Sequence, residues 1–457
     1  LLQQFRFTPC PFSGEQTGEE LYASVNAKIG EMQARLLEIG KSFYDLYGQV
    51  RDLKIYCDYL AFGLEKEELN EKLLATERTF LLEAYVPAEQ TDAVAQELTS
   101  SAGAVYFEFT DVPEDENPPT LYKNNALVHN FEAITDMYSP PAAREMDPNA
   151  IMSFFYSVFL GFIMADVGYG LLMTICGTLL LMKIKRDTMM RRLSGVFAIG
   201  GIFTVIWGVL FNSFFGFALL PFKVMPDLQG DNMSWSLAGI RVPALLIVSM
   251  MIGVVQLMAG YICRAVQCWR RGQILDGIFD GIVWALFSLG VELAIAGFVE
   301  DFGVSILGPV GGIIAGASLL IAVLTAGRKE KLLGKFTKGF GAAYGVINYA
   351  SDILSYARLY GLMLAGAVIA DIISSNSVAL MTSGNALFII LGVLILLIGH
   401  VFNLAIGLLG AYIHDARLQY VEFYGRFFEG EGRLFTPLGS QQKHVWITRQ
   451  QEEKTAA

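Results

Sequence analysis

Residues 386–426 read ALFIILGVLILLIGHVFNLAIGLLGAYIHDARLQYVEFYGR, and the first acidic or basic side chain in this run, histidine aside, is Asp415. As a helix, the run would extend about 60 Å, twice the roughly 30 Å thickness of the hydrocarbon layer of a membrane. The segment must therefore tilt strongly or continue into the cytoplasm. It predicts an integral membrane protein whose last helix is long and tilted.

Further apolar runs precede this one, and most approach the roughly 20 residues that a membrane-spanning helix needs. They occupy residues 150–164, 166–182, 193–218, 243–262, 277–299, 304–326 and 342–373. The first two flank Met164-Ala-Asp-Val-Gly-Tyr-Gly170, which is either a tight turn between two helices or a kink within one. Asp166, in this segment, and Asp280 lie near span ends, and we interpret both as interfacial or structural.

The charge of the loops sets the number of spans. Lys and Arg are concentrated in the loops at 183–192, 263–276 and 327–341, whereas the loops at 219–242, 300–303 and 374–385 contain only Lys223 and Arg241. Positively charged loops face the cytoplasm. With eight spans, the segments before and after the membrane domain both lie in the cytoplasm. We predict an all-α membrane domain of about eight helices over residues 150–426, with a cytosolic tail at 427–457.

The polar front part, residues 1–149, predicts a cytosolic arm with a small α/β lobe. Apolar residues recur at helical spacing over 15–75, with a break near Gly63, which favours a helical hairpin or coiled coil. Residues 79–86 and 104–109 are typical of strands and 88–102 of a helix. Such an arm binds other proteins or packs on itself. Because the chain begins at Leu1 without Met, we expect further residues before it.

Composition excludes several classes of function. The net charge of −11 argues against a nucleic-acid partner. The five cysteines are far apart or lie in apolar runs, with a spacing that fits no metal or redox site, so we expect reduced structural cysteines. Walker motifs, catalytic triads and metal-ligand clusters are absent from the sequence. We therefore expect no cofactor, no metal and no ATP cleavage by this chain.

Arg358 is the charge that lipid tolerates least. It lies 16 residues from the start and 15 from the end of the run at 342–373, so each end is about 23 Å away along a helix, too far for snorkelling. An ion pair with Asp352 or Asp371 is the simpler, purely structural explanation, but neither aspartate lies on the same helix face as Arg358. We expect a partner on another helix or another subunit. Small residues on the same face, which permit either tight static packing or a moving neighbour, are Ser351, Ser355, Gly361 and Ala365.

Other polar groups in these spans are candidates for an ion path, because each is costly in lipid. Arg417 and His414 lie on the cytoplasmic half of the last run, whereas His400 and Asn403 lie on its outer half. A histidine in such a place is also explained as a structural residue. The candidate lining residues are Glu292, Asp352, Asp371, His400, Asn403, His414 and Glu422.

Four segments resemble one family, the V-type ATPase subunit called a in eukaryotes and I in bacteria and archaea. The first is Pro118-Pro-Thr-Leu-Tyr-Lys-Asn-Asn125, followed by Phe131-Glu and Met137-Tyr. The second is Asp147-Pro-Asn, Phe154-Phe and Gly161-Phe-Ile-Met-Ala-Asp-Val-Gly-Tyr-Gly170. The third and fourth contain the arginines: Ser351-Asp-Ile-Leu-Ser-Tyr-Ala-Arg-Leu-Tyr-Gly-Leu362, and Ala411-Tyr-Ile-His-Asp-Ala-Arg-Leu-Gln-Tyr-Val-Glu-Phe-Tyr424 with Phe427-Phe-Glu-Gly-Glu-Gly432.

The resemblance implies a stator subunit of a rotary ATPase or ATP synthase in a bacterial or archaeal plasma membrane. Its partners would be a ring of proteolipid subunits, the peripheral-stalk subunits and the soluble ATPase sector. Arg358 matches the arginine that faces each ring carboxylate, and Arg417 the one beside it, so that protons or sodium ions pass through two half-channels. Gly366 and Gly407 depart from the eukaryotic pattern, which has histidine and glutamate there.

Two other classes compete with this interpretation. A secondary transporter would place broken helices around a mid-membrane site, and the glycine-rich segment at 161–170 is its best support. However, we see no repeat between residues 150–262 and 277–426, and a transporter would not need the helical arm. A membrane scaffold without transport would leave Arg358 unexplained.

Overall fold

The computed structural model describes residues 17–76, 79–101, 105–113, 116–185, 187–218, 234–237, 239–328, 332–437 and 443–444. The chain divides into two compact units. The front unit comprises Leu1–Val86 with Thr436–Ala457, and the helical unit comprises Pro87–Phe435. The expected outer loop at 219–242 and the tail at 427–457 lie largely outside the described residues.

The front unit is built on one helix, α1 (Gly18–Lys72). Its start is a capping box, in which the Thr17 hydroxyl accepts from the Glu20 amide and the Glu20 carboxylate accepts from the Thr17 amide. The helix continues through Gly63, so the predicted hairpin is wrong. A single glycine costs a helix only about 1 kcal/mol, and good helix formers follow this one. A two-residue ladder, β1 (Leu74–Ala75) with β2 (Phe80–Leu81), follows α1.

The segment after Pro87 is less sheet-like than the sequence predicts. The short helix η2 (Ala88–Gln90) and α2 (Thr91–Ser101) confirm the helix predicted at 88–102. Residues 105–109 form no strand, and β2 is only two residues long, so the strands predicted at 79–86 and 104–109 are largely wrong. The two segments with alternating apolar residues do not pair with each other in the described part of the chain. A strand without a partner is not stable, because its backbone groups bond to water instead.

Helices make up most of the rest, and they occur at all eight predicted positions. They are α5 (Asn149–Met164), α6 (Val167–Lys183), α7 (Met189–Leu210), α8 (Ala244–Arg270), α10 (Val283–Phe298), α11 (Leu307–Thr325), α12 (Leu332–Ser355) with α13 (Ala357–Met381), and α14 (Ala386–Arg417). Among the described residues, six helical segments are long and apolar enough to cross a membrane; α5 and α6 are shorter apolar helices.

Short elements connect these helices. The turns α3 (Ala126–His129) and α4 (Glu132–Tyr138) precede α5. Two ladders follow α7: β3 (Ser213–Phe214) with β4 (Phe217–Ala218), and β5 (Ser234–Leu237) with β6 (Ile240–Pro243). The turn α9 (Ile274–Asp276) and the π-helical turn η4 (Gly277–Ile282) lead into α10, and η5 (Glu300–Phe302) follows it. The chain after α14 continues as the π-helical turn η6 (Leu418–Phe423) and η7 (Tyr424–Arg426).

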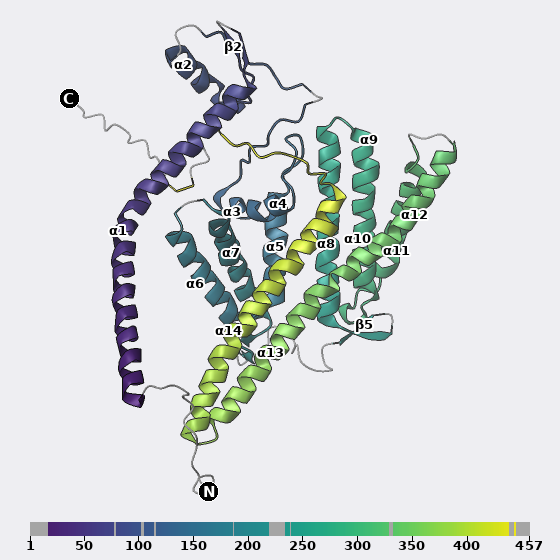
Figure 1. The fold of residues 1–457 in the computed structure, drawn as a ribbon. Coiled ribbons are helices and arrows are strands. Elements are labelled where there is room, and N and C mark those ends of the chain that lie inside the picture. The colour runs from purple at the N-terminus through teal and green to yellow at the C-terminus, as the bar shows by residue number, and fades with distance from the viewer. Residues whose placement is uncertain are drawn as a thin grey trace, which may run out of the picture. The chain divides into compact units, whose positions relative to one another are not determined.

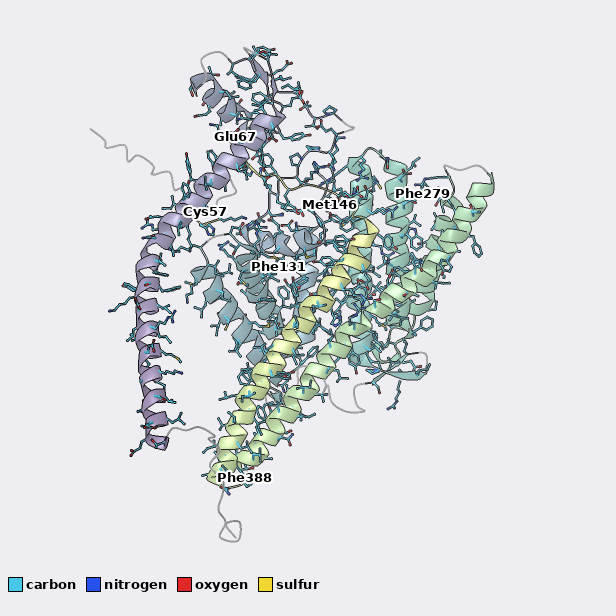
Figure 2. All side chains as sticks on the ribbon, in the orientation of Figure 1. Cys57, Glu67, Phe131, Met146, Phe279 and Phe388 are labelled. Carbon is cyan, nitrogen blue, oxygen red and sulfur yellow. The ribbon has the colours of Figure 1, made fainter. Side chains whose placement is uncertain are left out.

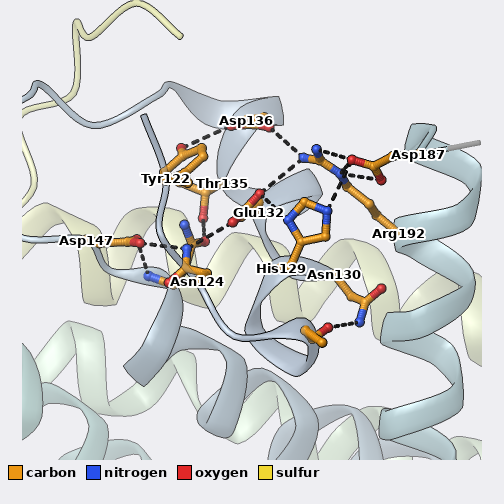
Figure 3. A network of polar contacts seen from close by, with 12 residues as sticks. Tyr122, Asn124, His129, Asn130, Glu132, Thr135, Asp136, Asp147, Asp187 and Arg192 are labelled. Atoms are coloured by element: carbon orange, nitrogen blue, oxygen red, sulfur yellow. Dashed lines mark hydrogen bonds and ion pairs between the residues drawn. The ribbon is translucent and has the colours of Figure 1, made fainter. Parts of the chain in front are cut away.

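The segment between α5 and α6 is a turn between two helices. Figure 3 shows that the end of α6 lies beside the start of α5: His129, before α5, lies 3.1 Å from Asp187, after α6. Arg192 at the start of α7 bonds Asp187 at 2.7 Å and lies 3.4 Å from Glu132. The hydrogen bonds from Arg192 lower the pKa of Asp187, whereas burial raises the pKa of Glu132. Both ends of the α5–α6 pair therefore lie at one end of the helical unit.

The other positively charged loops lie at that same end. Thr135 in α4 bonds Tyr424 at 2.8 Å, which brings the end of the last helix to this end. Arg271, after α8, pairs with Glu429 at 3.2 Å, and Arg328, after α11, with Asp280 at 2.9 Å. Figure 2 shows Met146 and Phe279 toward this end and Phe388, in the first turn of α14, at the other. These contacts are the ones expected if the chain crosses the membrane an even number of times before it reaches each positively charged loop.

This arrangement predicts the sidedness of single cysteines in a cysteine-free background. Lys185→Cys and Gln273→Cys should react with a membrane-impermeant maleimide only from the cytoplasm, because both are exposed at the positively charged end. Ser383→Cys, between α13 and α14, should react only from outside. Labelling of Lys185→Cys from outside would contradict the eight-span topology.

Close packing fixes the helical unit. The core is aromatic, and its fully buried members include Tyr156, Phe159 and Phe423. Gly161 lets α5 approach the backbone of α7, since a Cβ there would lie 2.7 Å from the Phe203 carbonyl carbon. In Figure 1, α13 and α14 run side by side and obliquely to α5, α8 and α10. The last two membrane segments are thus tilted relative to their neighbours.

Candidate functional site

Arg358 lies directly after a break in the long helix predicted at 342–373. The helix α12 ends at Ser355 and α13 begins at Ala357, and Tyr356 between them has a fully buried side chain. Short-range bonds replace the α-helical pattern here: the Tyr356 amide donates to the Ile353 carbonyl at 3.1 Å. The ring of Tyr356 occupies the space that a side chain at Gly253 of α8 would fill. Packing against α8 therefore fixes the break.

The guanidinium of Arg358 has no ion-pair partner among the described residues. Its Nη1 atom is buried without a hydrogen bond, and neither candidate aspartate compensates it. Asp352 instead forms an ion pair with Arg426, which also bonds Tyr261 at 3.0 Å. Asp371 is half-buried, with no contact to Arg358. Among the described residues, neither aspartate of the same long helical segment pairs with Arg358.

Three polar residues from the end of α14 and the turn η6 lie around Arg358. Arg417 and His414 are close enough to repel its charge, and Glu422 is close enough to attract it. Arg417 is exposed, whereas Glu422 is buried, and its Oε2 atom has no hydrogen-bond partner in the described part of the chain. The structure thus brings together four residues predicted separately from two distant segments, with two fixed positive charges and one carboxyl group.

The small residues beside Arg358 are uncovered. Ser351, Gly361 and Ala365 are exposed and Ser355 is half-buried, and a Cβ at Gly361 would meet no atom within 4 Å. Ser355 donates to the carbonyl of Ser351 in its own helix at 3.2 Å and also interacts with Glu422 of η6. The other three residues are left exposed by the described helices, so static packing within the described part of the chain does not explain them.

His400 and Asn403 belong to a closed hydrogen-bond network rather than to an open channel wall. Ser374 donates to the Phe215 carbonyl at 2.5 Å, so it accepts from Nε2 of His400 at 3.0 Å. The other ring nitrogen, Nδ1, therefore accepts from the Tyr169 hydroxyl at 2.7 Å, which in turn accepts from Asn403 at 2.9 Å. The network holds His400 in its neutral, Nε2-protonated form.

The turn between α5 and α6 supports this network through Asp166. Its carboxylate caps α6 by accepting from the Tyr169 amide at 3.1 Å, and it also accepts from Ser213 at 2.6 Å and the Gly216 amide at 3.2 Å. The structural interpretation of Asp166 is confirmed. Ala165 before it adopts a left-handed conformation with φ 34°. These contacts fix the ring of Tyr169 against His400.

Glu292 lies apart from the other candidates. It is in α10 and lies near Tyr349 of α12, which also interacts with Ser288 of α10. No described contact joins Glu292 to His400 or Asn403. The structure therefore assembles only part of the set that the sequence suggested.

Two buried glutamines near Arg358 and Arg417 are not among the residues predicted from the sequence. Gln256 of α8 accepts from the Tyr356 hydroxyl at 2.8 Å and donates to Gln419 of η6 at 2.6 Å. Gln419 donates to Asp415 of α14 at 3.1 Å. An amide inside an apolar run is costly unless bonded, and that cost was the available signal. Only the fold reveals that the two glutamines meet.

The two glycines that depart from the eukaryotic pattern are differently placed. The Gly366 carbonyl accepts from Asn403 at 3.1 Å. A Cβ at Gly407 would lie 3.1 Å from the sulfur of Met164 in α5. Helix α5 therefore closes this position.

Comparisons with known proteins agree with the geometry. The chain is 30% identical over 438 residues to the A-type ATP synthase subunit I of Pyrococcus horikoshii, which covers 91% of this chain and 61% of the relative. It is 30% identical over 393 residues to that of Methanocaldococcus jannaschii (81% and 56%), and 26% identical over 476 residues to the V-type ATP synthase subunit I of Chlamydia trachomatis (90% and 69%).

The chain thus spans about three fifths of the length of these archaeal relatives. A family match covers residues 20–232, which include α1, the turn at Asp166 and α7. The relatives extend the similarity over most of the chain. This chain therefore matches the V-type ATPase 116kDa subunit family over residues 20–232 and is similar to A-type and V-type ATP synthase subunits I over most of its length.

Proposed function

We propose that the chain is the membrane stator subunit of a rotary ATPase or ATP synthase and that it passes protons or sodium ions between itself and a ring of proteolipid subunits. The observation that carries the proposal is Arg358, which forms no ion pair with any described residue and lies beside a strip of small, mostly exposed residues. Burying part of a cation without an ion-pair partner is costly. A carboxylate on a neighbouring subunit that passes along the strip supplies the missing charge.

Arginine suits this role because it stays charged when it is removed from water. A fixed cation stabilises a ring carboxylate that has lost its ion. It also prevents ions from crossing directly between the two half-channels. Arg417, exposed on the same side, extends the positive region, and Glu422 limits its strength. Cleavage of ATP belongs to other subunits of the complex.

Two polar regions are proposed for the half-channels. On the cytoplasmic side, His414 and Glu422 lead toward Arg358, with Asp352 farther along α12. The outer half-channel would include Asp371 of α13. His400 and Asn403 hold α13 in place through Ser374 and the Gly366 carbonyl. Glu292 would contribute from a separate helix.

Helix α1 is proposed as the part that binds the peripheral stalk and the soluble ATPase sector. Apolar side chains emerge all along it and are exposed in the described structure, among them Tyr22, Met32, Leu36, Phe43 and Tyr59. Apolar surface of this extent marks a protein-binding helix. The arm and the tail are proposed to lie in the cytoplasm of a bacterial or archaeal cell, with the helical unit in the plasma membrane, because positively charged loops face the cytoplasm.

A bulky residue in the strip tests the proposed contact with a moving ring. Ser355→Trp and Ala365→Trp should each slow ATP-driven ion uptake into vesicles about tenfold, because a ring helix can no longer approach closely. Ala317→Trp is the matched control, since Ala317 is an exposed small residue on α11. Uptake is compared at equal amounts of assembled complex. If both strip variants transport like the control, the ring does not pass this face.

A further inference from the structure

We propose that Gln256 and Gln419 are positioning residues that hold the two arginine-bearing segments in a fixed orientation to each other. The inference rests on the proposed function, because such accuracy has a purpose only if Arg358 and Arg417 must meet a passing carboxylate. Neither glutamine touches the ion path. Both act through the backbone that carries the arginines.

The four residues involved form one directional chain. The Tyr356 hydroxyl donates to Gln256, Gln256 donates to Gln419, and Gln419 donates to Asp415, at 2.8, 2.6 and 3.1 Å. All four side chains are fully buried. Each amide uses its oxygen toward the donor and its nitrogen toward the next acceptor. With Asp415 as the final acceptor, reversing either amide or both would place oxygen against oxygen, so the chain then has one arrangement.

The chain ends close to both arginines in the sequence. Tyr356 is the residue that breaks the helix, two positions before Arg358. Asp415 and Gln419 lie two positions before and two after Arg417. Helix α8 supplies Gln256 and, at Gly253, the space for the Tyr356 ring. One static helix therefore sets the rotation of both arginine-bearing segments about their axes.

Burying these polar groups has no other evident advantage. Removing an amide from water without hydrogen-bond partners is costly, and replacing both partners of a buried hydrogen bond by apolar groups can be nearly neutral. Leucine at either glutamine would be compatible with lipid and with the aromatic core. What the polar chain adds is a unique geometry, since hydrogen bonds depend on direction and apolar contacts do not.

Replacing the central amide tests the inference. In intact complexes, Gln256→Leu should lower the number of ions transported per ATP hydrolysed by about threefold or more, because a displacement of about 1 Å at a working group has large effects. ATP hydrolysis itself should fall less. Ser249→Ala is the matched control: Ser249 is also fully buried in α8, but it bonds only Leu246 of its own helix. Its coupling should equal that of the wild type.

A pH profile separates positioning from simple packing. In Gln256→Glu, the protonated acid can accept from Tyr356 and donate to Gln419 as glutamine does, whereas the carboxylate has no proton to donate. Coupling relative to wild type should therefore be retained at low pH and lost as pH rises. Titratable groups around this position are Tyr349, Tyr356, Asp415 and Glu422, and the wild type at each pH corrects for them. A packing role alone would give no pH dependence specific to this variant.

Tyr356→Phe decides the matter if Gln256→Leu complexes fail to assemble, because it removes one hydroxyl and keeps the ring against Gly253. It should lower coupling in the same direction. If Arg358→Ala in parallel vesicles still transports ions, the proposed function itself fails. If Arg358→Ala is inactive while Tyr356→Phe and any assembled Gln256 variant couple like wild type, the positioning role is wrong and the proposed function stands.

Discussion

Complexes that carry Arg358→Ala are expected to lose ATP-driven ion uptake to the background level, a decrease of at least about a hundredfold. Two unit charges about 4 Å apart at an effective dielectric of 20 attract by about 4 kcal/mol. This is enough to hold a ring carboxylate in its ion-free form and small enough for rotation to reverse. Without the guanidinium, which has no substitute among the described neighbours, the carboxylate keeps its ion. Arg358→Gln should be equally inactive, because it preserves size but not charge.

Two further arginine variants serve as comparisons for Arg358→Ala. Arg417→Ala should reduce uptake less, since Arg417 is exposed and lies near Glu422 at the C-terminal end of α14. Arg241→Ala, an exposed arginine of β6, should transport normally. Uptake into vesicles is measured at matched levels of assembled complex. Near-normal uptake by Arg358→Ala would refute the electrostatic mechanism, whatever the family relationship.

The largest effect on stability is expected from Asp166→Ala. The substitution removes the buried cap of α6 and the one oxygen, Oδ2, that accepts from both Ser213 and the Gly216 amide in a partly buried site. A lost cap costs about 0.5–2 kcal/mol, and each buried donor left without a partner about 1–3 kcal/mol. We expect the apparent melting temperature of the solubilised complex, followed by tryptophan fluorescence of this chain, to fall by about 5 °C or more.

The matched control for this measurement is Asp371→Ala. Asp371 is a half-buried aspartate of α13 whose carboxylate accepts no hydrogen bond from the described residues, so its removal should leave the melting temperature unchanged. Asp166→Asn should be intermediate, because its oxygen can still cap α6 while its nitrogen cannot accept from Gly216. A melting temperature for Asp166→Ala equal to that of the control would show that the turn does not depend on this carboxylate.

The membrane segments were predictable because hydropathy acts over every residue of a span, and lipid admits few alternatives to a helix. The isolation of Arg358 was predictable for a related reason: helical spacing alone excludes Asp352 and Asp371 as partners on its face. The structural role of Asp166 was predictable from its position in a glycine-rich segment near the ends of two spans. In each case the deciding interaction is local in sequence or is with the bilayer itself.

The errors come from interactions that local sequence does not contain. Gly63 suggested a break in α1, but one glycine among good helix formers is too weak a signal. The actual break at Tyr356 has no proline or glycine, because Gly253 of another helix creates it. Likewise, Gln256 and Gln419 form a hydrogen bond although they are 163 residues apart in the sequence. Glu292 does not contact His400 because their helices are not neighbours, and hydropathy does not specify which helices pack together.

The π-helical turn after Arg417 has a consequence for helical phase. In an α-helix of 3.6 residues per turn, a residue five positions on points about 140° away. In η6 the Tyr424 amide bonds the Gln419 carbonyl, five residues back, and this wider turn brings residues five apart nearly into line. Glu422 thereby faces the side that carries Arg417 instead of turning away from it. The bulge is equivalent to a one-residue insertion that places a negative charge beside the two positive ones.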